Sequence, residues 1–132
     1  MKRVLVPVLA GVLAAPVAAP LAFAQEVDCF VPQFRGATLA AGAQATMTVR
    51  NNGRPCALRV FTDIADQTPY DRMAVTKQPG HGRVDVSQPP YVRYRPAPGF
   101  TGTDSFEFEG DGKTQRLAPV HMRVAVTVTV NR

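Results

Sequence analysis

Serine and histidine are the residues of this 132-residue chain that come nearest to a hydrolytic site. Acyl transfer by a serine needs a histidine close enough to take its proton, and one common arrangement exposes that serine on a sharp strand-to-helix turn. The serines are Ser87 and Ser105, and neither lies in a G-x-S-x-G sequence. The histidines, His81 and His121, lie in a turn-forming segment and in a strand-like segment. We therefore predict no serine hydrolase chemistry.

A pair of carboxylates offers a second kind of chemistry. Glu107 and Glu109 are two positions apart in a strand-like sequence, so they share one face with their Cβ atoms roughly 7 Å apart. That separation is in the range that glycosidases use. Both residues alternate with apolar ones, however, so we expect them on an exposed outer face near His121 and Arg123. We interpret them as solvated residues and predict that the protein is not an enzyme.

Metal chemistry is the third possibility. His81 and His121 are far apart in sequence, and two histidines alone do not define a ligand set. Several aspartates could supply oxygen ligands, but the chain has no D-x-[DN]-x-[DN]-G calcium loop. These aspartates are Asp63, Asp66, Asp71, Asp104 and Asp111. We predict no metal and no cofactor, and keep a small metal- or ligand-binding β-sandwich protein as the alternative function.

The first 24 residues have the layout of a secretory signal peptide. Lys2 and Arg3 precede an apolar run over 4–13, and Ala22-Phe23-Ala24 is an A-x-A cleavage site. The alternative is an uncleaved anchor over 4–23, which is about long enough to span a bilayer. The predicted organisation is a signal peptide at 1–24 and one domain at 25–132. We expect a periplasmic or secreted protein whose mature chain does not span a membrane.

The charge of the mature chain is mildly basic. Without Lys2 and Arg3, 13 basic residues face 10 acidic ones, a side-chain charge of +3. Eleven of the 13 are arginines, and they form no run of three. A nucleic-acid surface needs clustered cations with interleaved aromatic residues, so we predict no nucleic-acid partner. Weak attraction to anionic polymers of the cell envelope fits this charge.

Two cysteines remain in the mature chain, Cys29 and Cys56. In an oxidising compartment, an isolated pair most simply forms one disulfide. Their spacing differs from the C-x-x-C of redox sites, and a metal site needs more ligands. The bridge would add roughly 3.5 kcal/mol to the free energy of unfolding.

Apolar residues recur at every second position, which is the pattern of half-buried β-strands. The clearest run covers 120–130, and further strands are expected over 46–50, 57–64, 84–86, 91–95 and 105–109, with short ones around 29–31 and 73–76. Turn formers separate them, including a predicted hairpin turn at 51–53 and a turn at 110–112. The predicted fold is all-β: an antiparallel immunoglobulin-like β-sandwich of about seven strands with one disulfide.

Three segments follow one another in the second half of the chain: Q-P-G-H-G-R-V at 78–84, Y-R-P at 94–96 and P-G-F-T-G-T-D-S-F at 98–106. With the closing valine strand, this series resembles the bacterial immunoglobulin-like and cadherin-like repeat domains of cell-surface proteins, over residues 75–130. We assign roles in specifying the fold to nine residues of the series: Pro79, Gly82, Tyr94, Pro96, Gly99, Phe100, Gly102, Asp104 and Phe106. Asp104 is expected to accept backbone N–H bonds, and Phe100 to close the end of the core.

The resemblance implies a non-catalytic module that acts by binding. Tyrosine and arginine are enriched where proteins make contacts. We therefore predict a contact surface formed by Tyr70, Arg72, Tyr91, Arg93 and Arg95. The expected partner is an envelope protein or an anionic surface polysaccharide.

Overall fold

The computed structural model describes residue 7, residues 10–19 and residues 27–132. Within these residues it contains ten β-strands and no helix. The described residues therefore include no helix that could span a membrane. Lys2, Arg3 and the predicted cleavage site after Ala24 lie outside the described residues, and the described residues 10–19 are exposed and form no strand.

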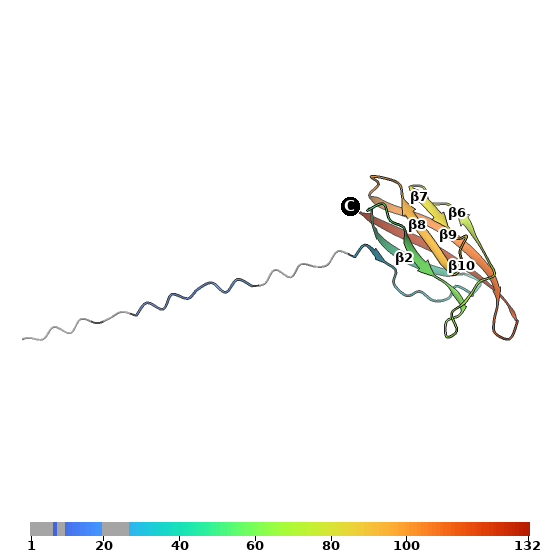
Figure 1. Cartoon of the computed structure of the whole chain (residues 1–132), viewed down its shortest axis with the longest axis horizontal. Helices are drawn as coiled ribbons and strands as arrows, with labels where there is room; N and C mark the ends of the chain where they lie inside the picture. The colour runs from blue at the N-terminus through green and yellow to red at the C-terminus, as the bar shows by residue number, and fades with distance from the viewer. Residues whose placement is uncertain (1–6, 8–9, 20–26) are drawn as a thin grey trace, which may run out of the picture.

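Two sheets account for most of the strands (Figure 1). The five-stranded sheet has the order β1-β2-β10-β9-β6. Its strands are β1 (Cys29–Phe30), β2 (Ala43–Arg50), β10 (Pro119–Asn131), β9 (Gly102–Lys113) and β6 (Arg72–Lys77). The three-stranded sheet has the order β3-β8-β7, with β3 (Cys56–Arg59), β8 (Tyr91–Pro96) and β7 (Gly82–Asp85). A small ribbon pairs β4 (Phe61–Asp63) with β5 (Thr68–Pro69).

The predicted all-β sandwich is confirmed, with two differences in detail. Ten strands replace the expected seven or so, because β1, β4 and β5 contain only two or three residues each. One pair is parallel: β2 runs alongside β10 from Ala43 opposite Val124 to Arg50 opposite Asn131. A parallel pair needs a long connection, and here almost the whole domain lies between the two strands.

The core lies between the sheets. Alternate residues of β2, β9 and β10 point inward and meet those of β3 and β8. Tyr94 of β8 stacks on Phe106 of β9 with ring centroids 5.8 Å apart, and Phe106 lies 6.2 Å from Phe108. All three rings are fully buried, so they join the two layers by apolar contact.

The disulfide also joins the two sheets. Cys29 in β1 is bonded to Cys56 in β3, with the Cα atoms 5.3 Å apart. β1 is an edge strand of one sheet and β3 an edge strand of the other. The predicted bridge is therefore confirmed, and it closes one side of the sandwich.

The single strand predicted over 57–64 is wrong. The chain leaves the three-stranded sheet after Arg59, and the Val60 amide donates to the carbonyl of Pro90. Asp63 then accepts bonds from the amides of Ala65 and Asp66, which starts a turn. Ile64, expected on the inner face, is 83% exposed at that turn.

The turn predicted at 110–112 is also wrong. Gly110 and Gly112 lie inside β9, opposite Met122 and Val120 of β10. A Cβ atom on Gly110 would come within 2.7 Å of Met122 Cε, so glycine makes room for a neighbouring side chain there. The actual turn lies over 114–118, where the Thr114 amide donates to the carbonyl of Ala118.

Asn51-Asn52-Gly53 is not a hairpin turn, because β2 and β3 belong to different sheets. The segment instead carries the chain from one layer to the other. The side-chain amide of Asn51 donates to the carbonyls of Ala97 (2.8 Å) and Phe100 (2.9 Å). These bonds attach the crossing to the loop that carries the P-G-F motif.

Candidate binding surface

Residues from all three segments of the series at 78–106 form hydrogen bonds with the buried carboxylate of Asp104. Its oxygens accept hydrogen bonds from the Tyr94 hydroxyl (2.8 Å) and from the amides of Gly80 (2.9 Å), His81 (3.0 Å) and Ser105 (2.9 Å). Asp104 therefore ties β9 to β8 and to the loop before β7. Sequence reasoning expected the amide donors and missed the Tyr94 hydroxyl.

These hydrogen bonds shift both titratable groups. Burial by itself raises the pKa of Asp104, but the bonds from Tyr94 and the three amides outweigh it and hold the pKa below its ordinary value. Burial, and then the hydrogen bond to Asp104, raise the pKa of Tyr94. The pair is thus an ionised carboxylate held by a neutral phenol.

The other motif residues close one end of the sandwich. The His81 ring stacks on Phe100 with centroids 4.2 Å apart and planes 4° apart. Gly99 and Gly102 on either side of Phe100 have φ values of 77° and 133°, which favour glycine. Pro79 is buried before the loop, and Pro96 is the last residue of β8. The motif residues therefore take part in packing and turns.

The fold separates the five residues of the predicted contact surface into different parts of the molecule. Tyr70 is only 3% exposed, so its placement on a contact surface is wrong. Its ring fills the space left by Gly110 and Gly112, and burial raises the pKa of its hydroxyl. Arg72 begins β6, at the edge of the five-stranded sheet, opposite Asp111. Neither residue lies on the three-stranded sheet that holds the other three.

Tyr91, Arg93 and Arg95 alternate with the buried Val92 and Tyr94, so they share the outer face of β8. The neighbouring strands add two arginines that sequence reasoning missed. Arg59 of β3 lies opposite Tyr91, and Arg83 of β7 lies opposite Arg95. We call this surface the basic face: Arg59, Arg83, Tyr91, Arg93 and Arg95.

The sequence contains part of the information that places Arg59 and Arg83 on the basic face. Arg59 lies at an alternate position of the strand expected over 57–64, and Arg83 directly precedes the strand expected over 84–86. Placing Arg59 and Arg83 beside β8 needed the strand pairing and register, which a single sequence does not contain.

Hydrogen bonds and ring contacts hold the arginines of β8 in place. The Arg93 guanidinium lies 4.5 Å from the centroid of the Tyr91 ring, and its Nη1 donates to Gln88 Oε1 at 3.0 Å. Arg95 Nη1 donates to the carbonyl of Gly53 at 3.1 Å. At the corner of the face, the Arg59 guanidinium lies 5.7 Å from the Phe61 ring centroid.

One acidic residue accompanies the four arginines. Asp85 of β7 lies opposite Arg93. Hydrogen bonds from Ser87 lower the pKa of Asp85, and the charge of Arg93 adds a smaller effect in the same direction. In the described part of the chain, no carboxylate forms an ion pair with Arg59, Arg83 or Arg95. The face therefore carries a local excess of positive charge.

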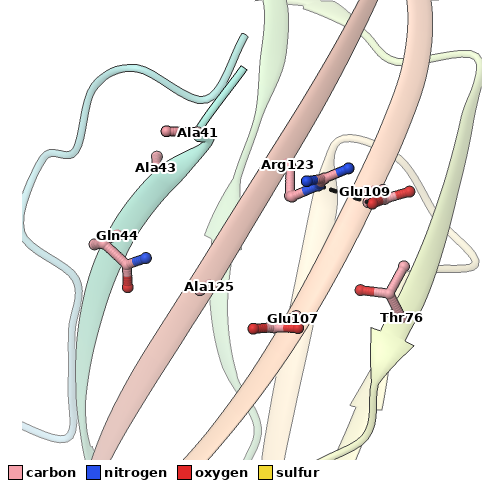
Figure 2. Close-up of a pocket in the computed structure, with 8 residues that line it drawn as sticks. All are labelled: Ala41, Ala43, Gln44, Thr76, Glu107, Glu109, Arg123 and Ala125. Atoms are coloured by element: carbon pink, nitrogen blue, oxygen red, sulfur yellow. Dashed lines mark hydrogen bonds and ion pairs between the residues drawn. The ribbon is translucent and has the colours of Figure 1, made fainter. Parts of the chain in front are cut away.

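The outer face of the five-stranded sheet carries charges of both signs. A depression of about 310 Å³ lies beside Ala125 on this face. Figure 2 shows Glu107, Glu109 and Arg123 among the residues that line it. Glu109 Oε1 accepts from Arg123 Nε at 3.0 Å, and Glu109 Oε2 lies 3.8 Å from His121 Nε2. The two glutamates lie on the outer face near His121 and Arg123, as expected, and Glu109 is already paired with a cation.

The two histidines lie in different surroundings. His121 Nδ1 is 2.8 Å from Asp111 Oδ1 on the outer face of β10 and β9, whereas His81 stacks on Phe100. Over the residues described, no three His, Cys, Asp or Glu side chains are grouped so that they could hold a metal ion.

Comparison with protein-family models matches residues 36–130 to the bacterial Ig domain. The match begins well before residue 75, so the family pattern includes β2 and β3 as well as the motif segments. A search of curated proteins finds no match to the chain. Because the matched residues form the two-layer sandwich and make up more than half of the sequence, the chain belongs to the bacterial Ig domain family.

Proposed function

We propose that this protein is an exported, non-catalytic interaction module that binds an anionic partner of the cell envelope through the basic face. The observation that carries the proposal is the set of four arginines that share the basic face with Tyr91, accompanied by Asp85 alone among acidic residues on these three strands. Arginine binds carboxylates and phosphates through two parallel hydrogen bonds. The family supports an interaction role, and fold alone would not assign the partner.

Export is part of the same proposal. The signal-peptide layout of 1–24 supports it, and so does the disulfide, because such bonds form and persist in oxidising compartments. We place the mature protein in the periplasm or outside the cell. N-terminal sequencing of the protein from the producing bacterium should begin at Gln25; a chain beginning at Met1 would contradict export by cleavage.

Ion-exchange retention tests the basic face with variants of equal net charge. The face variant is Arg83→Gln with Arg95→Gln, and the control is Arg35→Gln with Arg116→Gln, which are exposed and lie outside the face. On carboxymethyl-dextran the face variant should elute at lower salt than the control, because retention depends on where charge is concentrated. Equal elution of the two variants would contradict the proposal.

A further inference from the structure

We infer that the partner of the basic face is a linear acidic polysaccharide that lies along β8, with successive carboxylate or phosphate groups on successive rows of the sheet. This inference rests on the proposed function and adds the chemical class of the partner. It follows from the arrangement of the charges, from what holds them, and from the exposure of the face on the outside of the three-stranded sheet.

The charges form rows across the three strands. Arg83 and Arg95 make one row, and Arg93 occupies the next together with Asp85. Tyr91 and Arg59 make the third row. The rows from Arg95 to Tyr91 extend over about 13 Å of β8, since each residue of a strand adds about 3.4 Å. Such a stripe matches a ligand with repeated charges better than one with a single charge.

The row of Arg83 and Arg95 contains two positive charges and no negative charge. Like charges directly opposite each other on neighbouring strands are destabilising. Arg95 turns to the carbonyl of Gly53, which precedes β3, on the side of β8 away from Arg83. Neither guanidinium is paired with a carboxylate in the described chain. An oxyanion bound at this row would offset the two positive charges, so we expect this row to contribute most to binding.

Arg93 and Arg95 are partly ordered before any ligand arrives. The Tyr91 ring and Gln88 hold Arg93, and Gly53 holds Arg95. Ordering flexible side chains opposes binding, and this cost is smaller when the side chains are already held. Tyr91 is 37% exposed, so part of its ring remains available for the apolar side of a sugar.

The surface suits a chain better than a protein or a small molecule. The buried centre of a protein interface is largely apolar, whereas the outer positions of β8 are Tyr91 and two arginines, Arg93 and Arg95. Small molecules bind in hollows, and the shallow depressions of about 310 and 380 Å³ are lined by other residues, outside the basic face. A flexible polyanion can follow the exposed, charged face of a sheet and gains affinity from several weak contacts.

Titration of the ¹⁵N-labelled mature chain with galacturonate oligomers tests the inference. Galacturonate monomer, a long oligogalacturonate, inorganic phosphate and phosphatidylglycerol vesicles are the four probes. We expect the oligomer to bind at least about tenfold more tightly than the monomer, with amide shifts in β3, β7 and β8. Arg83→Gln with Arg95→Gln should weaken oligomer binding by about fivefold or more, and Arg35→Gln with Arg116→Gln should not.

The other outcomes separate the inference from the proposed function. Equal affinity for monomer and oligomer, or tighter binding to the vesicles, would overturn the polysaccharide assignment while leaving an anion site on the face. The absence of shifts in β3, β7 and β8 with every probe would overturn both. Native-like spectra of the variants show that a lost interaction does not reflect unfolding.

Discussion

At the scale of single residues, Asp104 shows how an acidic side chain is stabilised in an apolar core without a cation. A buried carboxylate is costly unless donors surround it. Here four donors do so, and three of them are backbone amides that substitutions elsewhere leave in place. The aspartate of the P-G-F-T-G-T-D-S-F segment thus fixes the position of the loop before β7 and of Tyr94.

Replacing Asp104 with alanine should lower the free energy of unfolding by about 2–4 kcal/mol, because the buried Tyr94 hydroxyl and the loop amides lose their acceptor. Urea denaturation measures the change. Asp66→Ala is the control, since Asp66 is exposed and should change stability by less than about 0.5 kcal/mol. Equal effects of the two substitutions would show that the Asp104 hydrogen bonds do not stabilise the fold.

The pKa of Asp104 also predicts a pH dependence. Because the folded pKa lies below the unfolded value of about 3.9, its contribution to stability is present above that value and is lost as pH falls toward the folded pKa. The wild-type chain should therefore lose stability steeply below about pH 4. In Asp104→Asn this part of the loss should disappear. Parallel stability curves for the two proteins from pH 6 to pH 2 would be the contrary result.

At the scale of elements, the strands with long alternating patterns could be predicted and the irregular connections could not. The run over 120–130 predicts β10 because each inward position is apolar. After Arg59 the pairing ends where Val60 meets Pro90, which accepts from the Val60 amide but has no N–H to donate back, and this partner is distant in sequence. Gly110 and Gly112 resemble turn residues in sequence, but their role comes from side chains of other strands.

Gly82, at the start of β7, is likewise required by its contact with another strand. A Cβ atom there would lie 2.5 Å from the carbonyl oxygen of Arg95, a backbone atom that cannot move alone. Gly82→Ala should therefore lower the free energy of unfolding by about 1–3 kcal/mol. Gly80→Ala, two positions earlier, is the matched control, because its Cβ would be 3.9 Å from its nearest neighbour. Thermal unfolding of both variants measures the difference; similar midpoints would contradict the close approach.

At the scale of the whole molecule, the disulfide and the core join the two sheets. Replacing both cysteines with alanine should lower the free energy of unfolding by up to roughly 3.5 kcal/mol, since Cys29 and Cys56 no longer restrict the unfolded chain. Dithiothreitol should destabilise the wild-type chain by a similar amount and leave the double variant unchanged. A wild-type chain that is indifferent to reduction would contradict a stabilising bridge.

Part of the basic face could be predicted from the sequence, and the rest depends on the pairing of strands. Tyr91, Arg93 and Arg95 share a face because of alternation within one strand, and that is visible in the sequence. Arg59 and Arg83 join them through pairing between distant strands. Tyr70 was misplaced because its ring fills the space over two glycines of β9, which only the packed sheets reveal.

On the proposed function, the basic face holds the exported Ig domain in the cell envelope. Cell fractionation at low and high salt tests it with three proteins: the wild type, Arg83→Gln with Arg95→Gln, and Arg35→Gln with Arg116→Gln. We expect the wild type and the second variant to stay with the envelope fraction at low salt and to be released at high salt. The face variant should be released already at low salt. Identical fractionation of all three proteins would contradict the claim.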